Sequence, residues 1–341
     1  MKPAYPLHYR AASLPAYNAN TLRALLSLRI TEKTLLKLEA GQLLIRMAAA
    51  PCNPSDIAFM QGGYNVVKPL PAVPGFEGSG FVADIGEGVD ETWLGKRVSL
   101  FIQGDGDGSW AEYVVAEAGN LLAVDDDLTI DQAAMFFVNP FTAWGLMEMV
   151  MAHGASCILI NAAGSRLSEY LLALAKERGV AVIGIVRKEQ TAAALADRGF
   201  AALVVSTGDD FVSQLNDLVA QHQPTVFLDA VAGEQSGFIA GMMPFNSKIV
   251  VYGGLSGKDL AGINTLQLIF KKLTITGFDL NAWFESSDGD KKKLAAQQLT
   301  AFIAEKKVQN PVSISVGLDE LVKGLRHYLG SMSDGKMLIH F

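Results

Sequence analysis

The sequence predicts an α/β protein that joins a β-rich domain to a doubly wound parallel sheet. Short strands separated by glycine and proline fill residues 1–125 of the 341-residue chain. Six apolar strands then alternate with helices between residues 158 and 278, the pattern of a parallel sheet. A last short strand at 336–341 is expected to return to the first domain. The parallel sheet would therefore be an insertion in the β-rich domain.

The β-rich domain is predicted over residues 1–128 and 310–341, and the sheet domain over 129–309. In the first domain, strands are expected at 35–38 and 42–47, joined as a hairpin by 39–41, and at 78–88 and 110–115. Helices are expected at 131–150, where Pro140 should interrupt, and at 189–197, 211–221, 291–306 and 318–329.

A βαβ unit at 158–186 organises the sheet domain. An apolar strand, Ile158-Leu159-Ile160, leads through small residues at 162–165 into an amphipathic helix over 167–175 and a second strand at 182–186. Such a crossover is right-handed. The other strands of this domain are expected at 203–205, 226–229, 249–254 and 273–278.

The turn before this helix can hold a dinucleotide pyrophosphate against the helix N-terminus. It lacks G-x-G-x-x-G, because Gly164 stands alone and Arg166 and Ser168 occupy positions that favour glycine. A crossover that binds nothing therefore remains an alternative. Arg187-Lys188 ends the second strand, where an NAD site would carry an acidic residue. This favours a 2′-phosphate and hence NADPH, the alternative being a solvated basic strand end.

Composition and charge argue against several classes of protein. The net charge of −7 is spread along the chain, which disfavours nucleic acid and anionic membranes as partners. Cys52 and Cys157 form no disulfide framework or four-cysteine zinc lobe and fit a reduced compartment. Without a signal-peptide pattern or a span-length apolar segment, a soluble cytoplasmic protein is expected.

Five strings in fixed order resemble the medium-chain dehydrogenase/reductase superfamily over essentially the whole chain. They are AAPCNPSDIAFMQGGY (49–64), LPAVPGFEGSGFV (70–82), VNPFTAW (138–144), VYGGLSG (251–257) and GKMLIHF (335–341). The similarity is to the zinc-free branch, which includes quinone oxidoreductases and 2-enoyl thioester reductases. It implies a GroES-like catalytic domain and a Rossmann domain.

Zinc members of this superfamily carry cysteine and histidine ligands near three segments that here contain Ser55, Phe76 and Val138. A catalytic zinc needs about three converging protein ligands. The five histidines are scattered along the chain. We therefore expect no metal site.

The resemblance implies two catalytic residues, Tyr64 and Asn139. Tyr64 follows Gly62-Gly63, where enoyl thioester reductases carry a catalytic tyrosine. A phenol keeps its proton at pH 7 and can donate it, although Tyr64 could instead only shape the pocket. Asn139 is expected beside the nicotinamide. Asn53 and Asp56 are expected to hold the loop, through extended backbone before proline and a helix cap.

The resemblance also implies a set of NADPH-binding residues. They are Gly164, Ser165, Arg166 and Leu167 at the pyrophosphate, Arg187 and Lys188 at the 2′-phosphate, and Tyr252, Gly253, Gly254, Leu255, Phe278, Leu280 and Lys336 along the nicotinamide half. Asp279 departs from the enoyl thioester reductases, which tend to have a tryptophan there. A carboxylate would disfavour an anionic or strongly apolar acyl chain unless it faces solvent.

The predicted function is zinc-independent, NADPH-dependent reduction of quinones or activated C=C bonds in enones and enals. Two alternatives stay open: a trans-2-enoyl thioester reductase of fatty-acid synthesis that uses Tyr64, and a non-catalytic, redox-sensing NADPH binder, which the single-glycine turn would suit. The sixth strand and residues 278–284 resemble the segment that extends the sheet across a dimer in this superfamily. A homodimer is therefore expected, the alternative being an ordinary buried edge strand.

Overall fold

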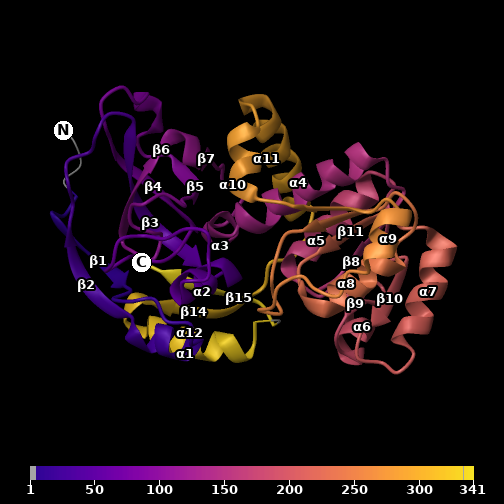
Figure 1. The fold of residues 1–341 in the computed structure, drawn as a ribbon. Coiled ribbons are helices and arrows are strands. Elements are labelled where there is room, and N and C mark those ends of the chain that lie inside the picture. Colours follow the sequence, from indigo (N-terminus) through magenta and orange to yellow (C-terminus); the bar gives the residue numbers. More distant parts are fainter. Residues whose placement is uncertain (1–4, 333) are drawn as a thin grey trace. The chain divides into compact units, whose positions relative to one another are not determined.

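The computed structural model describes residues 5–332 and 334–341 and divides the chain into two compact units. Unit 1 comprises Met1–Val138 and Asn310–Phe341, and unit 2 comprises Asn139–Gln309 (Figure 1). The chain passes from unit 1 to unit 2 after Val138, ten residues beyond the expected boundary at 128, and returns to unit 1 at Asn310. No helix within the described residues is both long and apolar enough to cross a membrane.

Unit 1 is built on a sheet with the strand order β14-β15-β3-β4-β5-β7, from which β6 branches by pairing with β3. The strands are β3 (Gln42–Pro51), β4 (Glu77–Ile85), β5 (Arg97–Phe101), β6 (Tyr113–Glu117), β7 (Leu121–Ala123), β14 (Val312–Gly317) and β15 (Lys336–His340). Strand β15 pairs antiparallel with β3, so the C-terminal strand returns to the first domain as predicted (Figure 1).

The remaining elements of unit 1 lie around this sheet. Strands β1 (His8–Ser13) and β2 (Arg29–Thr34) form a separate antiparallel pair. The helices are α1 (Thr21–Ser27), α2 (Pro54–Gln61), α3 (Ile130–Ala134) and α12 (Leu321–Gly330), with short 3-10 turns η1 (Glu91–Trp93), η2 (Ala118–Asn120) and η3 (Leu318–Glu320).

The predicted hairpin around residues 39–41 is wrong. Strand β2 ends at Thr34 and pairs with β1, whereas β3 pairs with β4 and β6. The intervening Leu36 is 82% exposed. The segment 35–38 therefore forms no strand and connects β2 to β3.

Unit 2 contains a fully parallel sheet with the strand order β10-β9-β8-β11-β12-β13. Its strands are β8 (Cys157–Ile160), β9 (Ala181–Val186), β10 (Ala202–Val205), β11 (Val226–Asp229), β12 (Lys248–Val251) and β13 (Thr274–Gly277). This confirms the six predicted strands and the Rossmann order, in which the direction of winding reverses between β8 and β11.

The helices of unit 2 are α4 (Val138–His153), which starts at the boundary, α5 (Arg166–Glu177), α6 (Glu189–Leu195), α7 (Phe211–His222), α8 (Gly233–Met242), α9 (Thr265–Phe270), α10 (Leu280–Ser286) and α11 (Gly289–Ala304). Helices α5 to α9 surround the sheet (Figure 1). The strands read as continuous apolar runs because both faces are covered, and Leu159, Phe227 and Ile249 lie in one buried core.

Pro140 does not interrupt a helix, contrary to the prediction. It lies in the first turn of α4, and the break falls earlier, between the end of α3 at Ala134 and the start of α4 at Val138. The N–H groups of a first turn have no partner inside the helix, so proline is tolerated there.

Candidate functional site

The carboxyl edge of the unit 2 sheet gathers the cofactor residues predicted for this unit. They follow four strands: Gly164 to Leu167 after β8, Arg187 and Lys188 after β9, Tyr252 to Leu255 after β12, and Phe278 and Leu280 after β13. Carboxyl ends of neighbouring parallel strands meet at one edge, where ligands of such sheets bind. Asn139 lies half-buried in the first turn of α4, whereas Tyr64 and Lys336 belong to unit 1.

Serines close the turn between β8 and α5 in place of the missing glycines. Ser165 caps α5, its Oγ accepting from the backbone N–H of Ser168 at 3.3 Å. The buried Ser168 hydroxyl reaches back to the carbonyl oxygen of Ala163 at 2.5 Å. Ala162 adopts a left-handed φ of 48°. The turn therefore stays tight, and the N-terminus of the 12-residue α5 can face an anion.

Two glycines beyond β12 differ in what surrounds them. A Cβ on Gly253 would lie 2.8 Å from the carbonyl oxygen of Ala230, so this position needs glycine for the close approach of two loops. A Cβ on Gly254 would meet nothing within 4 Å. The edge therefore has open space where the nicotinamide half is predicted, which fits NADP(H).

Cationic side chains lie at both predicted phosphate positions. Arg166 opens α5 and pairs with Glu169 at 2.5 Å, which holds its guanidinium on the first turn. Arg187 and Lys188 are exposed after β9. The Thr207 hydroxyl, after β10, donates to the carbonyl oxygen of Arg187 at 2.8 Å and fixes that strand end. These groups suit a dinucleotide that carries a 2′-phosphate.

A buried carboxylate, Asp229, accepts hydrogen bonds from residues at the same edge of the sheet. Asp229 ends β11, is fully buried, and through Oδ1 accepts from Asn161 Nδ2 at 2.5 Å and from the Ser236 hydroxyl at 2.8 Å. Burial, together with this carboxylate, raises the pKa of the Tyr252 phenol, which stays protonated. This network was not predicted from the sequence, although an aspartate that ends an apolar strand is a signal for it.

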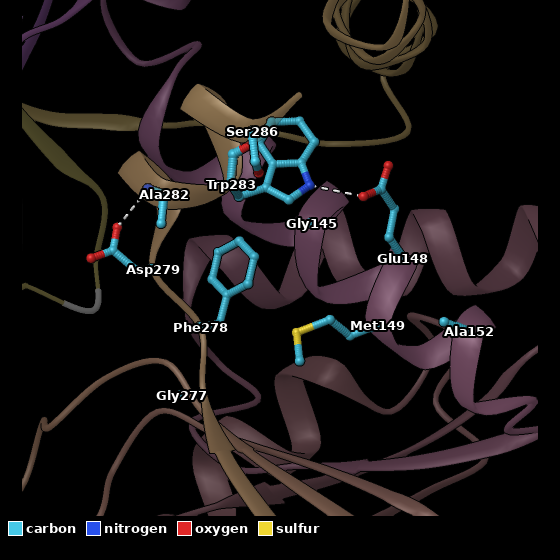
Figure 2. Close-up of a pocket in the computed structure, with 10 residues that line it drawn as sticks. All are labelled: Gly145, Glu148, Met149, Ala152, Gly277, Phe278, Asp279, Ala282, Trp283 and Ser286. Carbon is cyan, nitrogen blue, oxygen red and sulfur yellow. Dashed lines mark hydrogen bonds between the residues drawn. The ribbon is translucent and has the colours of Figure 1, made fainter. Parts of the chain in front are cut away.

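A cavity of about 410 Å³ lies between α4 and the segment that follows β13 (Figure 2). Glu148 organises one wall by accepting from Trp283 Nε1 at 2.8 Å and from Trp144 Nε1 at 2.9 Å. Lys291 Nζ lies 2.7 Å from the same carboxylate. The Phe278 ring packs so closely on Gly145 that a Cβ there would lie 2.5 Å from it. These contacts fix Phe278 and the helix that follows.

Asp279 also lines this cavity and faces solvent (Figure 2). Its Oδ1 accepts from the backbone N–H of Ala282 at 3.1 Å and caps α10. The Asp279 carboxylate therefore caps α10 and is hydrated. The sequence predicted that this carboxylate would disfavour an acyl chain unless it faced solvent, and it does face solvent.

In unit 1, Tyr64 is half-buried two residues beyond Gly62, which ends α2 in the left-handed conformation. Its ring centroid lies 5.3 Å from that of Phe76. Its hydroxyl oxygen accepts from Gln103 Nε2 at 3.0 Å. The predicted catalytic phenol therefore has a defined position, and Gln103 is a neighbour that sequence reasoning did not find.

Lys68 is an unexpected buried cation close to Tyr64, only 4% exposed. Its Nζ donates to the carbonyl oxygen of Gly106 at 2.7 Å and lies 5.7 Å from the ring centroid of Phe76. Burial lowers the pKa of Lys68 to about 8, against the opposing effect of nearby carboxylates, led by Asp107. The Tyr17 hydroxyl accepts from the backbone N–H of Lys68 at 2.8 Å.

Behind Phe76 lies a buried polar cluster of Asn53, Asp56, Glu77 and Lys336. Asp56 accepts from the backbone N–H groups of Asn53 at 2.6 Å and Phe76 at 3.1 Å, as expected for a loop-holding cap. Glu77 Oε2 accepts from Asn53 Nδ2 at 2.8 Å. Burial raises the pKa of Glu77 and raises that of Asp56 to about 7.

Lys336 is 5% exposed, and its Nζ donates to the Asn53 side-chain oxygen. Its predicted contact with the cofactor stays a prediction. Among the described residues, no group of three or more histidine, cysteine or acidic side chains is arranged to hold a metal ion.

Comparison with known proteins agrees with this architecture. Residues 39–126 match the alcohol dehydrogenase GroES-like domain, and residues 168–296 match the domain named zinc-binding dehydrogenase. A mitochondrial enoyl-[acyl-carrier-protein] reductase of Dictyostelium discoideum is 30% identical over 79% of this chain and 78% of its own length. The chain belongs to the medium-chain dehydrogenase/reductase superfamily. Its relatives place it in the zinc-free enoyl and quinone reductase branch, which confirms the predicted membership.

Two further relatives of this superfamily cover nearly the same length. The mitochondrial enoyl-[acyl-carrier-protein] reductase of Caenorhabditis elegans is 28% identical over 85% of this chain and 83% of its own. A crystal structure from Mesorhizobium loti, described as a candidate NADPH:quinone reductase, is 29% identical, with a TM-score of 0.91 over 99% of this chain and 100% of that one. The chain is an oxidoreductase of this branch.

The buried lysine predicts a pH-dependent stability. Between about pH 8 and its ordinary pKa of 10.5, Lys68 keeps its proton only in the unfolded chain. The free energy of unfolding should therefore rise with pH in that window, by at most about 1.4 kcal/mol per pH unit. Lys68→Met removes this term. In calorimetry, wild type should gain Tm relative to Lys68→Met on going from about pH 7.5 to about pH 9.5.

Lys323→Met, an exposed lysine of the same unit, is the control and should show no such change. A constant difference in Tm between wild type and Lys68→Met over this pH range would contradict a lowered pKa for Lys68.

Proposed function

We propose that this protein transfers a hydride from NADPH to quinones or to activated C=C bonds, without a metal. The observation that carries the proposal is the arrangement at one sheet edge of unit 2. There, Arg187-Lys188 follows β9, the helix N-terminus at Arg166 follows β8, and the open Gly254 follows β12. Along this edge, the two cations would bind a 2′-phosphate, the helix N-terminus would bind the pyrophosphate, and the open glycine would leave room for the nicotinamide.

The residues of the chain would bind NADPH, orient the substrate and supply a proton. NADPH supplies the hydride when bound. The loop at Gly253 and Gly254 would hold the nicotinamide, and Asn139 is the predicted polar neighbour on the same side. Tyr64 would donate a hydrogen bond to the substrate carbonyl or a proton to the carbon that does not receive the hydride. Its defined contacts with Phe76 and Gln103 support such a role.

A second candidate is the reduction of trans-2-enoyl thioesters. Two observations favour it: the relatives named above are enoyl-[acyl-carrier-protein] reductases, and Asp279 faces solvent while it caps α10. An apolar chain near Phe278 and Trp283 would then not be opposed by the Asp279 carboxylate, and the Glu148 carboxylate beside it is paired with Lys291. Enones and enoyl thioesters share the conjugated carbonyl, so Tyr64 would serve both.

A homodimer is part of the proposal. Strand β13 is the last strand of its sheet and pairs with β12 on one side only. The adjacent α9 exposes Leu266, Ile269 and Phe270. An unpaired strand edge beside apolar surface favours pairing with a second copy.

The phosphate site predicts a preference for NADPH over NADH. Wild type should bind NADPH well over tenfold more tightly, and Arg187→Ala should lose about ten- to a hundredfold of NADPH affinity while NADH binding changes little. Titration of both nucleotides by fluorescence measures this. Arg198→Ala, an exposed arginine beyond α6, is the matched control. Equal affinities in wild type would remove the 2′-phosphate assignment.

Tyr64→Phe should slow turnover of an enoyl thioester by about a hundredfold or more, because removal of a general acid costs about that much. NADPH oxidation is followed with crotonyl thioester and with a benzoquinone, and NADPH affinity should be unchanged. Tyr113→Phe, in the same unit, serves as the control. Full activity in Tyr64→Phe would remove the phenol from the mechanism, and NADPH binding without turnover of any substrate would favour the non-catalytic alternative.

Light scattering tests the dimer. We expect the mass of two subunits, because the free edge of β13 and the apolar α9 would be covered in the assembly. A mass near one subunit at working concentration would contradict this expectation.

A further inference from the structure

Gln103 is placed to act on Tyr64. Its side-chain Nε2 donates to the hydroxyl oxygen of Tyr64 at 3.0 Å, from a loop 39 residues away in the sequence. We propose that Gln103 is a positioning residue for proton donation: it orients the Tyr64 hydroxyl and stabilises the phenolate that forms when the proton leaves. This inference rests on the proposed function and deepens it.

The geometry around the pair is fixed by Phe76. Ile102, the neighbour of Gln103, donates its backbone N–H to the carbonyl oxygen of Phe76 at 2.8 Å. The Tyr64 ring packs against the ring of the same residue. Both partners of the hydrogen bond are therefore held by one buried residue, so the distance between them is set by the fold.

A second cross-link joins the same two loops. Lys68, four residues after Tyr64, donates to the carbonyl oxygen of Gly106, three residues after Gln103, at 2.7 Å. Tyr17 holds the backbone of Lys68 from the other side, because its hydroxyl also donates to the Lys68 carbonyl oxygen at 2.9 Å. The loop that carries Tyr64 is thus bound to the loop that carries Gln103 at two points. Little ordering is then needed when substrate binds.

The hydride and the proton add to different carbons of the C=C bond. Hydride addition to one carbon of the C=C bond brings an electron pair and pushes the π electrons onto the carbonyl oxygen as an enolate. The other carbon then takes the proton from the Tyr64 hydroxyl, the O–H bond breaks, and its electron pair stays on the phenolate oxygen. Water returns a proton afterwards. The substrate is reduced by two electrons and NADPH is oxidised by two.

The hydrogen bond from the Gln103 amide to the Tyr64 oxygen becomes stronger as the proton leaves. A hydrogen bond to an ionised acceptor is about twice as strong as one to a neutral acceptor. The N–H of Gln103 therefore stabilises the state with phenolate character more than the ground state, which is the requirement for lowering a barrier. An amide does not ionise at working pH, so this donor is always present.

A double-mutant cycle tests whether Gln103 acts through Tyr64. Gln103→Ala should lower kcat for an enone or crotonyl thioester by about ten- to a hundredfold, as expected for loss of a hydrogen bond to a charged group, with little change in KM. In the Tyr64→Phe background the same substitution should cause no further loss, because the phenolate is gone. Equal losses in both backgrounds would overturn the inference and leave the role of Tyr64 standing.

Gln103→Glu is the second variant, since it keeps the size of the side chain but replaces the donor by a carboxylate. It should lower kcat more than Gln103→Ala, because a negative charge opposes the developing phenolate. NADPH affinity should match wild type in both variants. Activity of Gln103→Glu equal to wild type would overturn the inference.

A readout without turnover separates this inference from the proposed function. Alkaline titration followed by tyrosinate absorbance, with Tyr64→Phe subtracted to assign the signal, should show a higher midpoint pH in Gln103→Ala than in wild type. An unchanged midpoint would overturn the stabilising role even in an active enzyme. Wild-type rates in Tyr64→Phe would instead remove the acid step of the proposed function, and the role of Gln103 with it.

Discussion

The buried carboxylate of Glu77 holds together the segments on which the Tyr64 region depends. Its Oε1 accepts from the backbone N–H groups of Phe137 at 2.7 Å and Val138 at 2.8 Å, which supplies acceptors to the start of α4. Its Oε2 accepts from Asn53, which caps α2. A buried charge without such partners would cost several kcal/mol. One side chain on β4 thus fixes the helix before Tyr64 and the last residues of the first segment of unit 1, Phe137 and Val138.

In unit 2, Asp229 likewise accepts hydrogen bonds from backbone N–H groups at the start of a helix. Its Oδ1 accepts from the backbone N–H groups of Val231 at 2.9 Å and Ala232 at 3.0 Å, the latter in a left-handed conformation just before α8. Asn161 links the same carboxylate to the end of β8. In each unit, then, a buried carboxylate satisfies the donors where a helix begins next to the predicted site. Rigid elements hold such sites more precisely than mobile loops do.

The parts of the structure that follow from local pattern were predictable, and the parts that depend on distant partners were not. The strands of unit 2 are buried on both faces, so their apolar runs mark them in sequence. The contacts of Glu77 join residues 24 and 60 positions apart, and that of Gln103 spans 39, with no periodic signal. Lys68 is buried although lysines are mostly exposed, and no pattern in the sequence around it marks it as buried. The predicted hairpin is absent because β2 ends at Thr34 and pairs with β1, a distant partner that the leucine content of 35–38 does not reveal.

The contacts of Asp279 change what its departure from the family pattern implies. In the sequence, a carboxylate in place of a tryptophan indicates that no acyl chain binds at that point. In the fold it caps α10 and faces water, whereas Trp283, one turn further along the same helix, points to Glu148 and lines the cavity with Phe278. An indole therefore still contributes to this wall, from a different position. Shape and polarity here admit an apolar group, so the substitution at 279 does not separate enones from enoyl thioesters.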